Sequence, residues 1–204
     1  MLSVLEYVIK DVCDISEKDY NLSFSYMTDS RKAKIERLKN LQAKKCTLAG
    51  EWLVRLLLKK ITGQAAESFV INADKNGKPY STNAHGLHFN ISHSQNMVAA
   101  VVCSKNVGVD IEAIRPVNLK LAKRMCTPHE LKYIFGDLPA DADYEKNTNP
   151  VYVSRFLEIW TLKEAYLKYK GTGITGFEAF KVPDDGFKKI KIEHKDYVMH
   201  IVTE

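Results

Sequence analysis

The sequence has no long apolar run, no closely spaced cysteines and no arginine-rich tail, and each absence excludes a class of protein. Its longest apolar stretches are too short to cross a membrane as a helix. The four cysteines stand far apart without a CxxC pair, which argues against zinc knuckles and thioredoxin-like sites and is typical of thiols in a reducing compartment. The first residues lack the basic segment and unbroken apolar core of a signal peptide, so we expect a cytoplasmic protein.

The composition is that of an ordinary globular protein. The 204 residues are 45% hydrophobic and 27% charged, which is enough to bury one core or the cores of two small halves. The formal net charge is +5, and this excess predicts an acidic partner. Nucleic acid is the weakest candidate for that partner, because zinc-finger spacing and aromatic RNA-binding motifs are both missing.

Hydrophobic periodicity and capping residues predict two similar series of helices and strands. The first series has a strand at 4–9, helices that open at Ser16 and Asp29, a long helix at 43–62, and strands near 69–72, 87–91 and 97–103. The second has a strand at 107–111, helices that open at Asn118 and at the capping box Thr127–Glu130, a long helix at 152–170, and strands near 177–182, 187–193 and 197–203. Each series contains a long helix with one tryptophan, so we interpret the chain as a structural duplication.

Gly171, Gly173 and Gly176 spell a phosphate-binding fingerprint, but their position argues against that function. A dinucleotide fingerprint follows a strand and opens a helix, so that the helix N-terminus faces the pyrophosphate. Here the glycines follow a helix, whose C-terminal end is the negative pole. We therefore interpret them as a helix stop and a loop.

The helix before these glycines carries the more informative charges. Trp160, Glu164 and Lys168 are spaced by four residues and share one face, with Lys163 beside them. An exposed Glu–Lys pair is the ordinary interpretation of such spacing. The neighbouring residues are mostly apolar or aromatic, however, which predicts a largely buried helix whose charges line a cleft.

The stretch Gly108-Val-Asp-Ile-Glu112 offers a partner for those charges. Alternate residues of a strand point the same way, so Asp110 and Glu112 share a face. Two adjacent carboxylates repel unless a cation joins them, and magnesium suits one or two carboxylates with phosphate oxygens. Asp143 and Glu145 have the same spacing within a polar loop, where we predict no function.

The stretch His88-Phe-Asn-Ile-Ser-His-Ser94 is polar at its end. With His85, its histidines raise the possibility of zinc, but the spacing matches no common site. Ser92, His93 and Ser94 are equally compatible with hydrogen bonds to a phosphate and with ordinary polar residues in a turn.

Taken in order, these segments resemble the 4′-phosphopantetheinyl transferases, and specifically the Sfp-like group. The resemblance runs from about residue 28 to 180 and rests on Arg31 and Lys34, "TLAGEWLVR", Gly77-Lys-Pro79, "FNISHS", "GVDIE" and "WTLKEAYLK". It implies an α+β fold of two similar α/β halves related by pseudo-twofold symmetry. The halves would span residues 1–105 and 106–204, with the active site in the cleft between them.

The resemblance also implies an activity. Such an enzyme transfers the phosphopantetheine arm of coenzyme A to a serine of an acyl or peptidyl carrier protein, and 3′,5′-ADP leaves. Carriers of this kind serve fatty-acid, polyketide and nonribosomal-peptide synthesis. The implied metal is magnesium, with manganese as an alternative.

Each matched position then receives an expected role. The metal ligands would be Asp110, Glu112 and Glu164. Glu164 would also act as the base, while Lys163 and Lys168 would neutralise the pyrophosphate. The coenzyme A site would comprise Arg31, Lys34, Thr47, Gly77, Lys78, Pro79, Asn90, Ser92 and His93. Cys46 departs from the family, which often has a basic residue there, and Lys44 and Lys45 project in other directions from a helix.

The partner implied by the resemblance is an acidic carrier protein, which the basic net charge fits. We expect it to contact residues 119–134 and 171–180, and we expect a monomer without nucleic-acid or membrane partners. The alternative is a non-catalytic carrier-binding or nucleotide-binding protein on the same scaffold. Competent residues at all the proposed catalytic positions argue against it.

Overall fold

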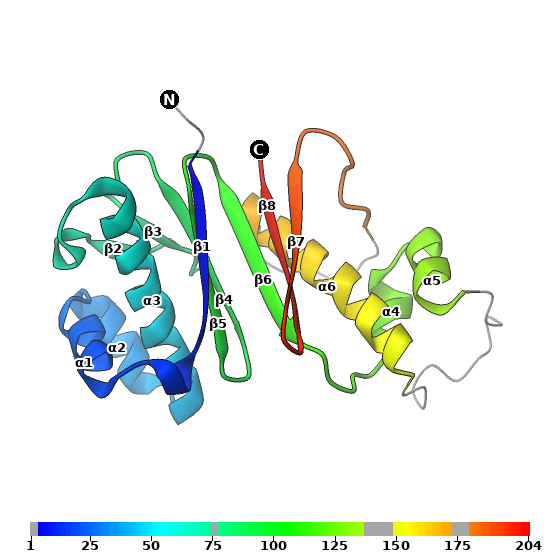
Figure 1. The fold of residues 1–204 in the computed structure, drawn as a ribbon, viewed down its shortest axis with the longest axis horizontal. Coiled ribbons are helices and arrows are strands. Elements are labelled where there is room, and N and C mark those ends of the chain that lie inside the picture. Colours follow the sequence, from blue (N-terminus) through cyan, green and yellow to red (C-terminus); the bar gives the residue numbers. More distant parts are fainter. Residues whose placement is uncertain (1–3, 75–76, 137–148, 173–179) are drawn as a thin grey trace.

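The first half of the chain forms a sheet with helices on one side (Figure 1). The structure is a computed structural model that describes residues 4–74, 77–136, 149–172 and 180–204. In the first half, its elements are β1 (Leu5–Asp11), η1 (Val12–Asp14), α1 (Glu17–Ser25), α2 (Asp29–Arg37), α3 (Leu41–Thr62), η2 (Ala66–Ser68), β2 (Ile71–Ala73), β3 (Pro79–Ser81), β4 (His88–Ser94) and β5 (Met97–Cys103). An antiparallel sheet has the order β1-β5-β4, and β2 pairs with β3. Helix α3 packs on β5, and together they build the first core.

The second half repeats this arrangement. Its elements are β6 (Val107–Ala113), α4 (Lys120–Met125), α5 (Pro128–Phe135), α6 (Pro150–Lys170), β7 (Lys188–His194) and β8 (Tyr197–Thr203). The antiparallel sheet has the order β6-β8-β7, and α6 packs against β6 and β8. In both sheets the first strand lies at an edge, the last strand lies in the centre, and a long helix covers one face. The predicted α+β fold of two similar halves is therefore confirmed.

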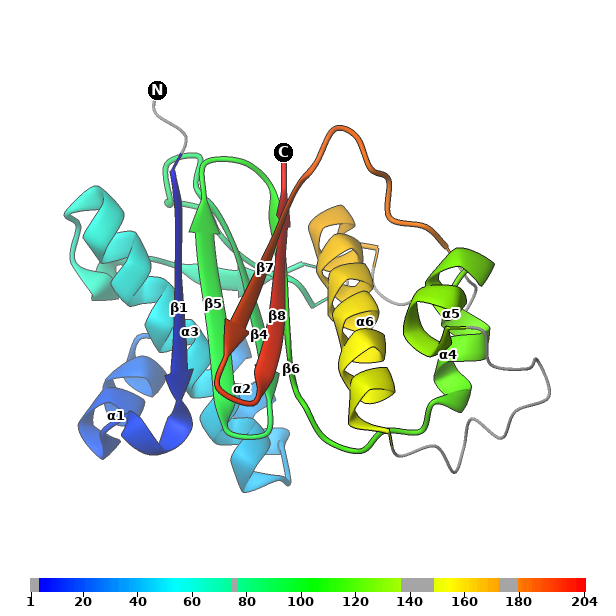
Figure 2. The same ribbon diagram turned by 45° about the vertical axis from the view of Figure 1, so that its right-hand side comes forward.

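The two sheets pack against each other through the faces that their long helices leave open. A shared core contains Ala99 and Val101 from β5, Val109 and Ile111 from β6, and Ile201 from β8. Figure 2 shows the consequence: the sheets lie between α3 on one side and α6 on the other. Strand β6 of the second half runs beside β4 of the first half, so residues from both halves meet along this line.

Local sequence signals account for the helix ends. Ser16 accepts a hydrogen bond from the backbone N–H of Asp19, and Thr127 with Glu130 forms the predicted capping box. Gly63 and Gly171 end α3 and α6 in the left-handed conformation, with φ of 74° and 71°. The interpretation of Gly171 as a helix stop is thus confirmed, while Gly173 and Gly176 lie outside the described residues.

The predicted boundaries needed small corrections. The helix expected from Asn118 begins at Lys120, because the Asn118 side chain accepts the Lys120 N–H. The strand expected at 177–182 lies largely outside the described residues, and 180–182 are not in a strand. Asp143 and Glu145 also fall outside the described part. Among the described residues, no helix is long and apolar enough to cross a membrane.

Candidate active site

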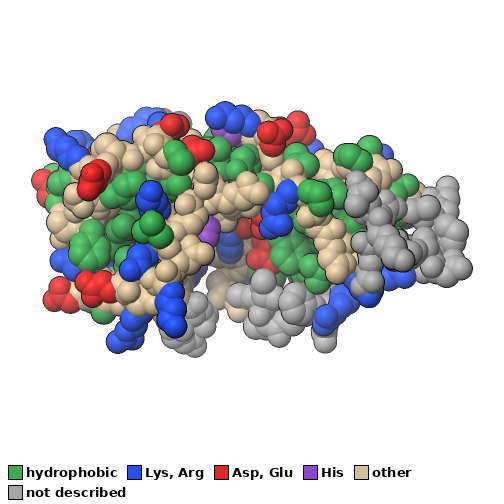
Figure 3. All heavy atoms as spheres, turned by 90° about the horizontal axis from the view of Figure 1, so that it is seen from below, with side chains coloured by type: hydrophobic (Ala, Val, Ile, Leu, Met, Phe, Trp, Pro, Cys, Tyr) green, Lys and Arg blue, Asp and Glu red, His purple; other side chains and the backbone are tan. Residues whose placement is uncertain are grey.

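The acidic residues of β6 face helix α6 across a very short distance. Asp110 lies on this face, whereas Val109 and Ile111 point into the core between the sheets, as the alternation predicts. A Cβ atom at Gly108 would come within 2.0 Å of the carbonyl oxygen of Ala165. The glycine therefore permits a close approach of helix and strand that another residue would prevent. Viewed from below, the surface is hollowed between the two halves, with acidic and basic side chains together in the hollow (Figure 3).

Lys168 joins the carboxylate of Asp110 to a residue of the first half. Its Nζ lies 2.6 Å from Asp110 Oδ1 and 2.9 Å from Ser92 Oγ. The Ser92 hydroxyl in turn donates to the same Asp110 oxygen at 2.7 Å. Residues from β4, β6 and α6 therefore converge on one carboxylate, and the ammonium supplies the cation that the acidic pair was expected to need.

Glu164 lies in the same cluster and is only 8% exposed. Burial first, and then the negative charge of Asp110, raise the pKa of Glu164 to about 7, although Lys168 acts in the opposite sense. A carboxylate with such a pKa accepts and releases a proton near neutral pH.

Two buried carboxylate oxygens in this cluster have no hydrogen-bond partner among the described residues, namely Asp110 Oδ2 and Glu164 Oε1. Unpartnered buried carboxylate oxygens are costly, and a divalent cation is the kind of group that satisfies them. Within the described part of the chain, no three acidic, histidine or cysteine residues are grouped closely enough to hold a metal by themselves. The donor set fits an ion that takes its remaining ligands from a phosphate-bearing substrate, as magnesium commonly does.

Glu112 is held differently from Asp110. Its Oε2 accepts a hydrogen bond from Ser94 Oγ at 2.6 Å. Burial is the main cause that raises the pKa of Glu112, and the Ser94 hydrogen bond partly opposes it. Ser92 and Ser94 therefore donate to the carboxylates of β6, while a hydrogen bond from this stretch to a phosphate stays a prediction.

A basic cavity lies next to the acidic cluster. Its volume is about 270 Å³, and it brings together six of the nine residues proposed for coenzyme A, with Cys46 among the remaining lining residues. The six are Arg31, Lys34, Thr47, Gly77, Pro79 and His93. A second cavity of about 250 Å³ shares Gly77, Pro79 and Ile91 with the first and reaches Lys168 and Asn90. The two cavities together connect the basic residues of α2 with the charged end of α6.

Arg31 is anchored by a buried ion pair. Its Nη2 lies 3.0 Å from Glu51 Oε2, and the other oxygen of Glu51 lies 3.3 Å from Arg55 Nη2. Two arginines and one glutamate leave one net positive charge, which an anion in the cavity would balance. His93 lies at the cavity rim with an exposed side chain, where partial desolvation and then the charge of Lys168 lower its pKa.

Two positions near this cavity differ from expectation. The hydroxyl of Thr47 donates to Ala43 O at 2.8 Å, so a hydrogen bond to a phosphate would require it to rotate. Cys46 is buried, while Lys44 and Lys45 line a separate groove with Tyr20 and other residues. Neither lysine therefore replaces the basic residue that the family often has at position 46.

The side chain of Lys78 reaches across to the second half. Its Nζ donates to Lys168 O at 2.8 Å and to Asn106 Oδ1 at 3.3 Å, at the C-terminal end of α6 where a cation is favoured. The backbone turn that contains Lys78 lines both a cavity of about 330 Å³ and the one that reaches Lys168. The turn thus borders the cavities as expected, but the lysine amine contacts the helix end.

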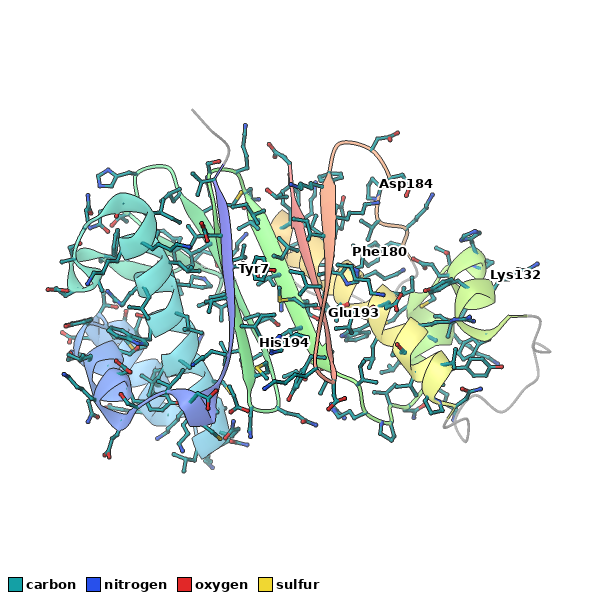
Figure 4. All side chains as sticks on the ribbon, in the orientation of Figure 1. Tyr7, Lys132, Phe180, Asp184, Glu193 and His194 are labelled. Atoms are coloured by element: carbon teal, nitrogen blue, oxygen red, sulfur yellow. The ribbon has the colours of Figure 1, made fainter. Side chains whose placement is uncertain are left out.

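Lys163 points away from the acidic cluster, which does not fit the expected contact with pyrophosphate. Its amine lies 2.9 Å from Glu130 Oε2, donates to Met125 O at 2.6 Å and also donates to Phe180 O. Phe180 lies beside α6 in Figure 4. The side chain is 1% exposed, so Lys163 holds α5 and the segment after residue 179 against α6. The helical turn of about 100° per residue separates it from Glu164.

Sequence reasoning missed one residue of this site, Glu51, and the partner of another, Ser94. Glu51 pairs with Arg31 but lies on another helix, α3. The one sequence signal for it is that this acidic residue stands among the apolar residues of α3. The contact of Ser94 with Glu112 depends on how β4 and β6 pack, which no local pattern records.

Comparison with known proteins identifies the family. The model described as 4'-phosphopantetheinyl transferase superfamily matches residues 106–202, and the one described as 4'-phosphopantetheinyl transferase, N-terminal, matches residues 14–105. The chain belongs to the 4′-phosphopantetheinyl transferase superfamily. The two matches together cover nearly all of the chain. Their boundary lies between β5, the last strand of the first sheet, and β6, the first strand of the second.

Individual relatives support membership of the Sfp-like group. The chain is 29% identical to 4'-phosphopantetheinyl transferase psf-1 of Bacillus pumilus over 82% of its length and 69% of that relative. It is 32% identical to a 4'-phosphopantetheinyl transferase of Bacillus subtilis over 72% of its length and 62% of that relative. It is 27% identical to 4'-phosphopantetheinyl transferase Sfp of Bacillus subtilis (strain 168) over 79% of its length and 67% of that relative. The matches thus span about two thirds of each relative.

These names support a 4′-phosphopantetheinyl transferase, and they do not favour the non-catalytic alternative.

Proposed function

We propose that this chain transfers the 4′-phosphopantetheine arm of coenzyme A to a serine hydroxyl of an acyl or peptidyl carrier protein. The observation that carries the proposal is the connected pair of cavities, with Arg31 and Lys34 at one end and Lys168 at the other. Beside Lys168 lie Asp110 and Glu164 with their unpartnered oxygens. A basic anion pocket joined to an acidic cluster suits a substrate that carries phosphates and a metal.

The donor would lie along the two cavities. Arg31, Lys34 and His93 would hold the 3′-phosphate, while the turn that contains Gly77 and Pro79 would border the adenine. The pyrophosphate would then reach Lys168, whose ammonium already borders the second cavity. Arg31 suits this role because its pairing with Glu51 fixes the guanidinium before the ligand arrives.

The acidic cluster would hold the metal. Magnesium, or manganese in its place, would contact Asp110 and Glu164 through the oxygens that lack partners, together with Glu112. When bound, the ion would neutralise charge on the pyrophosphate. Lys168, Ser92 and Ser94 would keep the carboxylates oriented through the hydrogen bonds described above.

Glu164 would also accept the proton of the carrier serine, because it is a buried carboxylate beside Lys168 with an oxygen that lacks a partner. The serine oxygen would form a bond to the phosphorus that bears pantetheine. The bond from that phosphorus to the oxygen bridging to 3′,5′-ADP would break, and Lys168 would neutralise the charge on the departing phosphate.

The carrier would approach from the side of α4 and α5. These helices carry Lys120, Lys123, Arg124 and Lys132, and the acid Glu130 is paired with the buried Lys163. An acidic carrier would be attracted to such a surface. The stretch 171–180, also expected to contact the carrier, lies mostly outside the described residues. As part of the proposal, the chain acts as a monomer in the cytoplasm. The four free cysteines support a reducing compartment.

Intact mass spectrometry tests the proposal directly. The purified chain, coenzyme A and magnesium are incubated with a panel of apo-carriers from fatty-acid, polyketide and peptide synthesis. We expect at least one carrier to gain the mass of one phosphopantetheine group while 3′,5′-ADP appears in equal amount. The variant Glu164→Gln keeps the side-chain shape but not the base, so we expect its turnover to fall by about 100-fold or more.

A chelator supplies the second arm of this test. Addition of EDTA should stop the transfer, and magnesium or manganese should restore it. If every carrier stays at its apo mass although the chain binds coenzyme A, the binding-only alternative replaces the proposed transfer.

A further inference from the structure

Strand β6 is an edge strand with backbone donors that its own sheet does not use. Among the described residues it pairs with β8 alone, on one side. Successive N–H groups of a strand point to opposite edges, so every second N–H of β6 faces away from β8. Such groups are buried beside β4 and need acceptors, because an unpaired buried N–H is costly.

Three side chains of β4 supply these acceptors. Val109 N donates to Asn90 Oδ1 at 3.0 Å, Ile111 N donates to Ser92 Oγ at 3.4 Å, and Ala113 N donates to Ser94 Oγ at 3.1 Å. Each bond spans 19 residues, so β4 and β6 run parallel in register. We call this row of three side-chain-to-backbone bonds the seam between the halves.

Each serine of the seam also donates a hydrogen bond to a carboxylate of β6. A hydroxyl has one donor hydrogen, and Ser94 directs it to Glu112 Oε2 at 2.6 Å while it accepts from Ala113 N. Ser92 does the same with Asp110 Oδ1 at 2.7 Å. Asn90 takes part in the seam but contacts neither carboxylate among the bonds described. The seam therefore joins the halves at three points and orients a carboxylate at two of them.

We propose that Ser94 is a positioning residue that fixes the carboxylate of Glu112 for metal binding, so that the first half of the chain sets the geometry of a metal site in the second. This inference rests on the proposed function, because it takes Glu112 as a metal ligand. Ser94 is 7% exposed, and both of its hydrogen-bonding functions are used inside the protein. Partners of this kind behind a metal ligand commonly change metal affinity by about 10-fold to 100-fold when they are removed.

Direct metal binding tests the inference without turnover. Manganese is titrated into the full chain with saturating coenzyme A and no carrier. Electron paramagnetic resonance measures the free ion, and a blank of coenzyme A alone is subtracted. We expect Ser94→Ala to weaken manganese binding by about 10-fold. Ser94→Thr keeps the hydroxyl and should stay within about twofold of the unmodified chain.

Two matched variants separate positioning from general destabilisation. Thr203→Ala removes a buried hydroxyl that donates to Asn106 O at 2.8 Å and holds no carboxylate, so it should lower the melting temperature without weakening manganese binding. Ser23→Ala removes another buried hydroxyl, which donates to Leu48 O at 2.8 Å far from the acidic cluster. It should also leave manganese binding unchanged.

The outcomes distinguish this inference from the proposed function. Unchanged manganese affinity in Ser94→Ala overturns the positioning role, and so does an equal loss in Thr203→Ala and Ser94→Ala. If the unmodified chain binds no manganese with coenzyme A, the metal role of Glu112 fails and the inference fails with it. Transfer to a carrier, measured separately on the unmodified chain, reports only on the proposed function.

Discussion

Two lysines on α6 occupy opposite environments although only five positions separate them. Lys168 lies beside Asp110 with an exposed side-chain fraction of 29%, whereas the amine of Lys163 is enclosed by Glu130 and two carbonyl oxygens. An ammonium in the first setting can meet a substrate phosphate. An ammonium in the second setting already has its partners and would lose them by moving.

We predict that replacement of these lysines by methionine separates stability from turnover. Lys163→Met leaves the Glu130 carboxylate without its cation, so unfolding should become easier by roughly 3 kcal/mol, with little change in coenzyme A affinity of the folded protein. Lys168→Met also removes the cation beside a buried carboxylate, Asp110, but unlike Lys163→Met it should lower the kcat of the folded protein by about 100-fold. Thermal melts measure stability and steady-state kinetics measure kcat. A large loss of kcat in Lys163→Met with unchanged stability would show that Lys163 acts on the substrate phosphates.

The 3′-phosphate assignment is tested best at Lys34, because it is exposed while Arg31 is tied to Glu51. Lys34→Ala should raise the KM for coenzyme A by about 10-fold through loss of a charge-assisted contact. The KM for dephospho-coenzyme A should change far less, since that donor lacks the phosphate.

Lys32 is the matched control for this prediction. It lies on the same helix, but its amine is 5.9 Å from the ring centre of Phe24 instead of lining the cavity. Lys32→Ala should leave both KM values unchanged. Equal losses with both donors in Lys34→Ala would show that this lysine does not bind the 3′-phosphate.

At the scale of elements, the packing of α6 on β6 positions the whole acidic cluster. A Cβ at Gly108 would lie 2.0 Å from Ala165 O and 2.4 Å from Tyr169 N, both backbone atoms of α6. Backbone cannot rotate away as a side chain can, so the helix itself would have to move. Glu164 and Lys168 would move with it.

We therefore predict that Gly108→Ala destabilises the protein by roughly 3 kcal/mol and also lowers kcat in the folded fraction. Gly50→Ala is the matched control, since its Cβ would meet the side chain of Ile91 at 2.5 Å and alanine favours the helix. The side chain of Ile91 must shift, so Gly50→Ala should cost about 1–2 kcal/mol, less than Gly108→Ala, with kcat preserved. Denaturant unfolding measures stability, and an equal cost for both variants would contradict the close-approach argument.

At the scale of the whole molecule, buried titratable groups couple folding to pH. The Nδ1 atom of His200 is hydrogen-bonded to Thr161 Oγ1 at 2.7 Å. The pKa of His200 is lowered from 6.5 to about 4, mainly by burial and then by the charge of Lys191, while Glu158 opposes the change. Because the unfolded chain binds a proton near pH 6.5 and the folded chain does not, stability falls as the pH drops from 6.5 to 4.

We predict that this single group removes roughly 3 kcal/mol of stability over that range. Glu164 contributes with the opposite sign, because its raised pKa makes the folded state bind the extra proton. The effect is therefore read from the difference between the unmodified chain and His200→Asn in denaturant unfolding at several pH values. A difference that does not vary with pH would mean that His200 is protonated alike in both states.

The sequence by itself determined the elements and the family. Caps such as Thr127 with Glu130, and the stop at Gly171, act within one helical turn, so neighbouring residues suffice to predict them. The alternation of Asp110 with its apolar neighbours fixes which side chains share a face of the strand. The ordered motifs identified the family without any spatial information.

Only the tertiary structure decided which polar groups meet. The Ser94 contact with Glu112 depends on how the two halves dock, whereas the contact of Lys168 with Asp110 spans 58 residues within the second half and depends on how α6 packs on β6. Packing within the second half likewise placed Lys163, and docking of the halves placed Lys78, in structural contacts that their motifs did not predict. Periodicity gives the direction of a side chain relative to its own element, whereas a bond also requires the position of the other element, which packing of both cores sets.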